Sequence, residues 1–229
     1  MRFTERSGLF LSLVALAILS SACAPQSSSV LYNTNLDSVE RPADAQERYG
    51  EYEVSERDTT DGTKYVYEDE LIRASFFVID GFISTSVENL TEYSIQLNLG
   101  EGAIVLPSGS SDQLVTGDMS YADRNQAIQP VTVPSGASAE TVLVPKSNVN
   151  FNSYSGLTIA PIISPSLVSG EDEAPTVEEN IGKTFRLLLP IEIQDTVNEY
   201  TFAFEVLGAR IVDIGENGDI TYGEVSSSP

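Results

Sequence analysis

The chain of 229 residues lacks histidine and tryptophan, has one cysteine, Cys23, and contains three lysines, Lys64, Lys146 and Lys183. Without histidine it has no Ser-His-Asp or Cys-His nucleophilic site, and transition-metal sites lose their commonest ligand. Ser-x-x-Lys, Gly-x-Ser-x-Gly and glycine-rich phosphate-binding motifs are also missing. Paired carboxylates are one route to glycoside hydrolysis, but no pair stands out in so acidic a chain. We therefore expect a protein that is not an enzyme.

Positive charge is the next scarcity, because 34 acidic residues face 12 basic ones and the net charge is -22. Nucleic acid needs a basic protein face, and anionic lipid attracts basic segments, so both are excluded as charge-driven partners. A surface rich in carboxylates stays soluble by self-repulsion, which salt screens, and this suits a saline environment. Hydrophobic residues make up 41% of the chain, enough for a packed core.

Residues 1–22 have the three parts of an export signal. Arg2 and Arg6 supply the positive start, Leu9–Leu19 is the apolar centre, and Ser20–Ala22 are the small residues before cleavage. The apolar run is shorter than the about 20 residues that a membrane-spanning helix needs. We expect this signal peptide to be removed.

The stretch Leu19-Ser20-Ser21-Ala22-Cys23 resembles the lipobox of bacterial lipoproteins, with Ser20 where a large aliphatic residue is usual. The resemblance implies that fatty acids such as palmitate are attached at Cys23. Several acyl chains on one residue anchor a protein stably, because each buried CH2 adds about 0.8 kcal/mol. Ala24 stands where enteric lipoproteins retained at the inner membrane carry aspartate, which implies sorting to the outer membrane if one is present.

Ordinary secretion is the alternative, since Ala22-Cys23-Ala24 also fits a small-x-small cleavage site. Cleavage after Ala24 would place Pro25 directly behind the scissile bond, where its ring fits poorly. Cleavage after Ala22 would leave Cys23 as a free thiol without a partner in an oxidising compartment.

Composition predicts how the mature chain is divided. Residues 23–61 are polar and rich in carboxylates, so we expect a flexible acidic tether, in which a short helix fits Pro42–Tyr52. Residues 62–224 form the predicted β domain, and 225–229 a tail.

Alternation of apolar and polar residues with period two predicts strands through the β domain. Asp80-Gly81 separates Leu71–Ile79 from Phe82–Val87 and predicts a hairpin. The aromatic residues Phe76, Tyr93, Phe202 and Phe204 are expected in the core, and the loop 165–182 is too long for a simple connection. Eight to ten such strands predict an all-β fold, a two-sheet antiparallel, immunoglobulin-like sandwich. The other predicted strands are 93–99, 103–107, 113–117, 139–145, 157–163, 184–193, 199–206 and 210–214, and 220–223 follows the last turn.

The segments YADRNQAIQPVTVPSG (121–136), GKTFRLLLPIEI and YTFAFEV resemble a group of uncharacterised bacterial lipoproteins. The resemblance spans most of residues 63–207 and implies an immunoglobulin-like fold and an envelope location. It carries no activity.

The segment DIGENGDITYGE resembles a calcium-binding loop, but position 3 is Gly215 and the flanks are strand-like rather than helical. The alternative is a hairpin in which Asn217-Gly218 makes a type I′ turn, and the flanks favour it. As weak calcium ligands the segment offers Asp213, Asn217, Asp219 and Glu224. No other cofactor is expected.

Asp123 and Arg124 lie together in a polar loop between hydrophobic strands. They form either an interaction loop or a solvated turn with a local ion pair.

These observations predict a cell-envelope lipoprotein that is held at a membrane by its lipid anchor. We expect its β domain to contact an envelope protein as a structural or interaction module. The alternative is an envelope lipoprotein that binds a cation or a carbohydrate. No nucleic-acid partner is expected.

Overall fold

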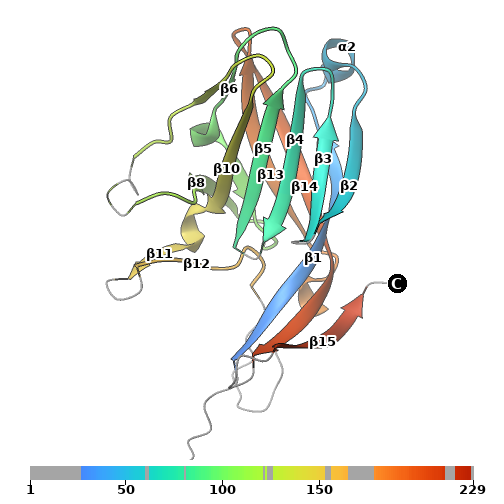
Figure 1. Ribbon diagram of the computed structural model, residues 1–229, viewed down its shortest axis with the longest axis vertical. Helices are drawn as coiled ribbons and strands as arrows, with labels where there is room; N and C mark the ends of the chain where they lie inside the picture. The colour runs from blue at the N-terminus through green and yellow to red at the C-terminus, as the bar shows by residue number, and fades with distance from the viewer. Residues whose placement is uncertain are drawn as a thin grey trace, which may run out of the picture.

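The computed structural model describes residues 27–59, 62–79, 81–120, 122, 126–152, 156–164, 178–214 and 220–227. Nearly all of them lie in strands or the turns between strands (Figure 1). The short helices are α2 (Ala45–Tyr49) and the 3-10 turns η1 (Leu99–Glu101), η2 (Lys146–Asn148) and η3 (Glu178–Asn180). The strands are β1 (Ser27–Glu40), β2 (Glu53–Thr59), β3 (Gly62–Glu68), β4 (Ile72–Ile79), β5 (Phe82–Asn89), β6 (Ile95–Leu97), β7 (Ala103–Val105), β8 (Ser111–Thr116), β9 (Val131–Val133), β10 (Ser138–Pro145), β11 (Val149–Asn152), β12 (Gly156–Ile159), β13 (Thr184–Ile193), β14 (Thr196–Ile214) and β15 (Ile220–Ser227).

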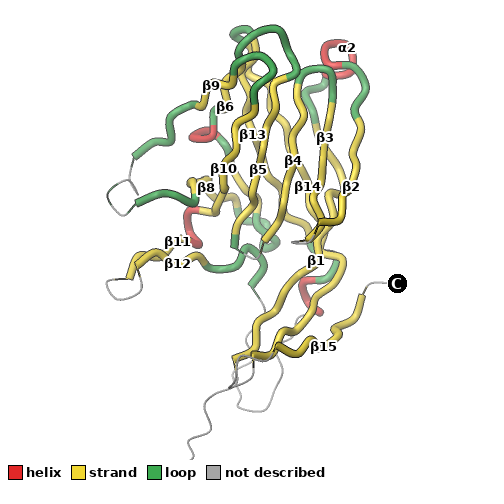
Figure 2. The backbone as a smooth tube through the Cα atoms, viewed as in Figure 1, coloured by secondary structure: helices red, strands yellow, loops and turns green. Residues whose placement is uncertain are grey.

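Thirteen of the described strands form one antiparallel sheet, in the order β1-β14-β13-β7-β8-β10-β5-β4-β3-β2. β15 pairs with β14, and β6 links β13 to β9, while β11 and β12 form a separate hairpin. The sheet curls around a common core into a nearly closed, barrel-like shape (Figure 2). At the open seam, the hydroxyl of Tyr65 on β3 donates a hydrogen bond to the carbonyl of Thr34 on β1.

The all-β, antiparallel prediction is confirmed, but the two predicted sheets are joined into one. The junction is β8, which changes partners along its length. Residues 111–113 pair with β7, and residues 114–116 pair with β10. A strand that changes partners halfway keeps the same alternation, so its sequence does not show the switch.

The predicted hairpin around Asp80-Gly81 is confirmed, because β4 and β5 pair from Ile79 opposite Phe82 outward. β13 has the predicted bounds, whereas β14 includes both predicted strands 199–206 and 210–214. The strand predicted over 157–163 ends at Ile159 in β12.

The core lies between the two halves of the curled sheet and is rich in aromatic rings. Phe76 and Phe202 have ring centroids 4.5 Å apart, and Phe185 stacks on Phe204 at 5.0 Å. Burying such rings contributes several kcal/mol in total at about 25 cal/mol per Å². Tyr93 is an exception to the predicted core, because 55% of it is exposed. Its strand, β6, begins only at Ile95, so Tyr93 lies in the preceding bend.

The flexible tether predicted for residues 23–61 is wrong for residues 27–59. β1 pairs with β14 over 14 residues and buries Leu36 and Val39 in the main core. The polar sequence of β1 has no clear strand pattern, and the strand is held in place by its backbone pairing with β14. The helix predicted within Pro42–Tyr52 is confirmed as α2, and β2 follows it. The signal peptide and Cys23 lie outside the described residues.

The first half of β1, the end of β14 and β15 form an arm that extends beyond the barrel (Figure 1). Val30 and Ala209 make a small buried cluster there, against Tyr32 and apart from the main core.

Candidate functional site

The structure places only some of the residues that the sequence singled out. Cys23, Asp123, Arg124, Asn217 and Asp219 lie outside the described residues. The remaining two calcium candidates are Asp213 and Glu224.

The backbone of β14 and β15 bears on the two interpretations of the segment that holds them, although residues 215–219 between these strands lie outside the described residues. Asp213 pairs with Thr221 and Glu224 with Arg210, and the hairpin closes at Ile214 opposite Ile220. Strands on both sides of the turn favour the hairpin over a helix-flanked calcium loop. Within the described residues, no three candidate metal ligands cluster.

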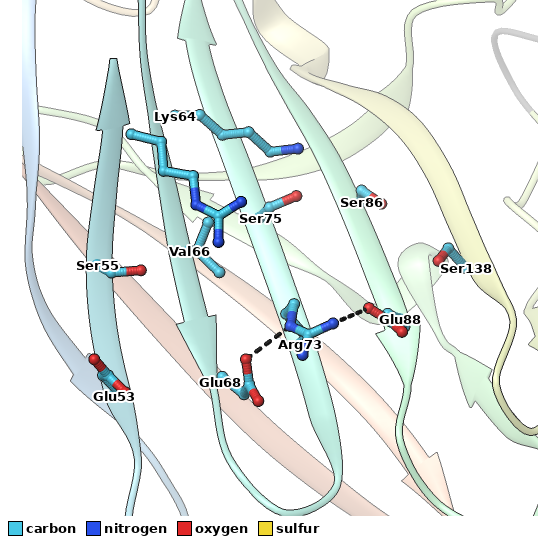
Figure 3. Close-up of a pocket in the computed structure, with 11 residues that line it drawn as sticks. Glu53, Ser55, Lys64, Val66, Glu68, Arg73, Ser75, Ser86, Glu88 and Ser138 are labelled. Carbon is cyan, nitrogen blue, oxygen red and sulfur yellow. Dashed lines mark hydrogen bonds and ion pairs between the residues drawn. The ribbon is translucent and has the colours of Figure 1, made fainter. Parts of the chain in front are cut away.

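A surface hollow lies on the outer face of the half-sheet β2-β3-β4-β5-β10, which we call the outer groove (Figure 3). In-register pairing places one residue of each strand in a row across the sheet. The middle row, called the floor, is built mostly from small side chains. Its residues are Ser55, Val66, Ser75, Ser86 and Glu140.

Two further rows border the floor, two residues away along each strand. The acidic rim consists of Glu53, Glu68, Arg73, Glu88 and Ser138. The basic rim consists of Arg57, Lys64, Phe77, Ser84 and Val142.

Two hollows fill the outer groove and run into each other. One of about 410 Å³ lies on the floor beside the acidic rim and also reaches Arg57. The other, about 290 Å³, lies beside Phe77 and Ser84 of the basic rim. Both are lined by Lys64, Ser75 and Ser86, so together they form one groove across the strands.

Local sequence explains this arrangement. Alternation turns the large apolar residues of these strands, such as Tyr65, Phe76 and Ile83, into the core and leaves small or charged residues outside. Gly62 starts β3 with a φ of 131°, and a Cβ there would lie 2.8 Å from the Phe77 ring. This glycine therefore lets the β2-β3 hairpin close over Phe77 and sets Arg57 beside Lys64.

The acidic rim is internally paired. Arg73 donates hydrogen bonds to Glu68 at 2.7 Å and to Glu88 at 2.5 Å (Figure 3). The hydrogen bond from Arg73 lowers the pKa of the Glu68 carboxyl, and the two carboxylates raise the pKa of the Arg73 guanidinium. Glu68 and Arg73 therefore stay ionised near neutral pH.

The basic rim differs, because Arg57 and Lys64 have no ion-pair or hydrogen-bond partner among the described residues. They lie directly opposite each other on β2 and β3. Like charges in cross-strand positions destabilise a sheet. Ser75, on the floor, is only 9% exposed, and within the described chain its hydroxyl has no hydrogen-bond partner either. The groove thus contains unsatisfied donors that face solvent.

A second polar cluster lies inside the barrel, around Asp69, which we call the Asp69 network. Asp69 Oδ1 accepts hydrogen bonds from the backbone N–H groups of Leu71 and Ile72, both at 2.9 Å. Asp69 Oδ2 accepts from the hydroxyls of Tyr67 at 2.7 Å and Tyr200 at 3.2 Å.

The network also holds the α2 segment against the end of the barrel. Arg41 Nη1 lies 3.9 Å from Asp69 Oδ2 and donates to the carbonyl of Gly50 at 3.1 Å. The hydroxyl of Tyr49 donates to the Asn198 side chain, which in turn donates to two backbone carbonyls.

Burial, followed by the influence of Asp69, raises the pKa of Tyr67 and of Tyr200. Both oxygens of Asp69 accept hydrogen bonds within the protein, so we assign this network to holding the fold together.

A third hollow, of about 450 Å³, lies between β8 and the segment that follows it. Asp118 and Gln126, on either side of the predicted interaction loop, line it. The loop residues Asp123 and Arg124 themselves are not described, so the hollow does not test their predicted role.

Comparisons with protein-family models, with curated proteins and with solved structures found no match to this chain. In the described part of the chain, no helix has the length and apolar character needed to span a membrane.

Sequence reasoning missed the outer groove. Its residues come from five strands, and Arg57 falls in the segment predicted to be a tether. One signal was available: Arg57 and Lys64 are placed symmetrically about the turn between β2 and β3.

Proposed function

We propose that this protein is a lipoprotein of the cell envelope whose β domain is a non-catalytic binding module, with the outer groove as its binding surface. The observation that carries the proposal is the unsatisfied set of donors in the groove: Arg57, Lys64 and Ser75. The resemblance at Cys23 to a lipobox supports the anchor. The resemblance to immunoglobulin-like envelope lipoproteins supports the same class of protein and remains part of the proposal.

The two carboxylates that pair with Arg73 favour binding over hydrolysis. Glycoside hydrolysis needs one carboxyl group with a raised pKa to act as the acid. Glu68 and Glu88 both pair with Arg73, and the pKa of Glu68 is lowered rather than raised. The two carboxylates therefore act as charge partners that fix Arg73.

Site-specific photo-crosslinking in cells tests the groove. A photoreactive amino acid at Ser86, on the floor, should capture an envelope component. The same amino acid at Gln96, which is exposed on β6 outside the groove, is the control. Equal capture at both positions, or none at Ser86, would contradict the proposal.

Cell fractionation tests the anchor separately. Replacing Cys23 with serine should release the protein from the membrane fraction, because the acyl chains have no other attachment residue. A Cys23→Ser protein that stays with the membranes would overturn the lipid-anchor interpretation without affecting the groove.

The arm favours a protein partner as a second candidate function. In the arm, β14 lies between β1 and β15. Within the described chain, β1 and β15 each pair with β14 alone. Such free strand edges can take up a strand of another protein. Val225→Pro would remove one backbone N–H of β15 and disturb this edge strand, so loss of a crosslinked protein from the arm, but not from Ser86, would assign that partner to the arm.

A further inference from the structure

We propose that the outer groove binds an acidic oligosaccharide, a sugar chain that carries carboxylate groups, with one carboxylate held between Arg57 and Lys64. This inference rests on the proposed function and names the ligand class of the same groove.

Overall charge does not attract an anion, because the chain has a net charge of -22 and the groove itself contains four glutamates. A local pair of cations without a partner in the described chain points instead to a single anionic group at this place on the ligand. Most basic side chains of the described residues interact with other groups of the protein. Within the described residues, those without an ion-pair or hydrogen-bond partner are Arg57, Lys64 and Arg186. Two of these three face each other in the groove. A carboxylate between them would replace a repulsion with two charge-assisted hydrogen bonds. The engaged residues are Arg41, Arg48, Arg73, Lys146, Lys183 and Arg210.

The floor points to hydroxyl groups on the ligand. Ser55, Ser75 and Ser86 present hydroxyls that donate and accept hydrogen bonds, and Ser75 is nearly buried without a partner in the described chain. Glu53 and Glu140, at opposite ends of the groove, are acceptors for ligand hydroxyls. A ligand with many hydroxyl groups matches this set of side chains.

The position on the face of the sheet disfavours a peptide. β3, β4 and β5, which form the middle of the groove, each pair with a strand on both sides, so their backbone groups are engaged in the sheet. Only the two end strands have a one-sided stretch: β2 pairs with β3 alone, and residues 138–142 of β10 pair with β5 alone. An extended peptide gains affinity mainly by adding its backbone to a free strand edge. On this face a ligand must make its bonds to side chains, as a sugar chain does.

The dimensions suit a short chain of sugars. Five strands about 4.8 Å apart give a groove about 19 Å long. The half-buried ring of Phe77 lies beside Lys64 and offers an apolar surface next to the cation pair. This ring is in the place where the apolar face of a sugar would pack.

Calorimetric titration of the purified full chain tests the inference. The probes are hexagalacturonate and hexamannuronate, with methyl-esterified hexagalacturonate as the ligand control, because it keeps the sugar chain and removes the charge. At least one of the two acidic probes should bind. The esterified probe should bind at least about tenfold more weakly, which corresponds to about 1.4 kcal/mol.

The variants use a matched change in net charge. Arg57→Gln/Lys64→Gln should weaken binding of the acidic probe at least tenfold. Arg186→Gln/Lys146→Gln removes the same charge from exposed positions outside the groove and should leave binding unchanged. The melting temperature of the groove variant should be the same or higher, because a repulsive pair is removed. A weakly binding variant that also melts at a lower temperature would point to a folding defect and count against the inference.

Three other results would each contradict a different part of the inference. Equal binding of the esterified probe would remove the role of the carboxylate. Equal binding of hexaglutamate would indicate an acidic peptide instead of a sugar. If neither acidic probe binds, the ligand class is wrong, whereas capture at Ser86 in cells would still support the groove as a binding surface.

Discussion

The outer groove and the Asp69 network use the same strands in opposite ways. Tyr67, on β3, points inward and donates to Asp69, whereas its neighbour Glu68 points outward and pairs with Arg73. Inside, both oxygens of the Asp69 carboxylate are satisfied by the protein. Outside, Arg57 and Lys64 face each other without a partner in the described chain. The contrast separates polar residues that hold the fold from those that are free to hold a ligand.

Solvent explains why both arrangements persist in one sheet. A buried polar group without a hydrogen bond costs about 1–3 kcal/mol, and a buried unpaired charge costs more. Water satisfies an exposed cation, so an unpaired arginine at the surface costs little. An unpaired polar group is therefore more costly in the interior than at the surface, and Asn35 Oδ1 is a buried side-chain oxygen without a hydrogen-bond partner in the described chain.

The largest effect is expected from Asp69→Ala. The change leaves the Arg41 charge, whose side chain is only 7% exposed, near two tyrosine hydroxyls and two N–H groups without an acceptor. The free energy of unfolding should fall by about 3–5 kcal/mol. Equilibrium unfolding in urea measures it.

Glu53→Ala in the acidic rim is the control, and it should change stability by no more than about 0.5 kcal/mol, because Glu53 is exposed. If Asp69→Ala does not fold, Tyr67→Phe removes only the 2.7 Å bond to the carboxylate and should cost about 1.5–3 kcal/mol. If the variants of the network and of the groove lost the same free energy of unfolding, the proposed difference between the two regions would be wrong.

The second-largest effect is expected from alkaline pH, which should destabilise the Asp69 network. Burial raises the pKa of Tyr67 and Tyr200 above that of a tyrosine in the unfolded chain, which is about 10. A raised folded-state pKa gives stability that is fully present below the unfolded-state pKa. This stability is lost as the pH rises from the unfolded-state pKa through the folded-state pKa. The melting temperature should therefore fall as pH rises beyond about 10.

Phenolate absorbance recorded during the alkaline titration tests the cause. The most resistant tyrosines should ionise together with unfolding, and Tyr67→Phe should reduce the pH dependence of the melting temperature. Ionisation of all tyrosines before any loss of structure would show that the buried hydroxyls are not coupled to stability.

The smallest effect is expected at Arg73, although its ion pairs are the shortest in the groove. Its side chain is 41% exposed, and those of Glu68 and Glu88 are 46% and 33% exposed. Arg73→Gln should lower the free energy of unfolding by about 0.2–1 kcal/mol, because water and salt screen exposed pairs. Urea unfolding at low and high salt should show the difference shrinking as salt is added. A loss above about 2 kcal/mol, independent of salt, would place this pair with the buried network instead.

The sequence predicted elements whose signals are local. The hairpin of β4 and β5 follows from alternation interrupted by Asp80-Gly81, and β13 from ten residues of strand-forming sequence. β1 and β2 were missed because their polar sequences become strands only through long-range pairing. The joining of the sheet at β8 was missed for the same reason.

The groove was not predicted because it is a property of register. Ser55, Val66, Ser75 and Ser86 are unremarkable in their own strands, and only the pairing of β2 to β5 brings them into one row. The motifs that the sequence did offer, around Asp123 and Asp213, each lie within one short segment of the chain. A loop motif is visible in one segment, whereas a surface assembled across five strands is not.

The pairing of β1 with β14 has a mechanical consequence. β1 starts at Ser27, at the tip of the arm, and runs antiparallel to β14 into the barrel until Glu40. A pull on the N-terminal end of β1, away from the barrel, acts along the strand and across its hydrogen bonds. The bonds from Ser27 to Glu40 then share the force in shear, where a hairpin pulled at its open end would lose them one after another. A domain tethered through this strand would resist being torn from its attachment while its groove holds a ligand.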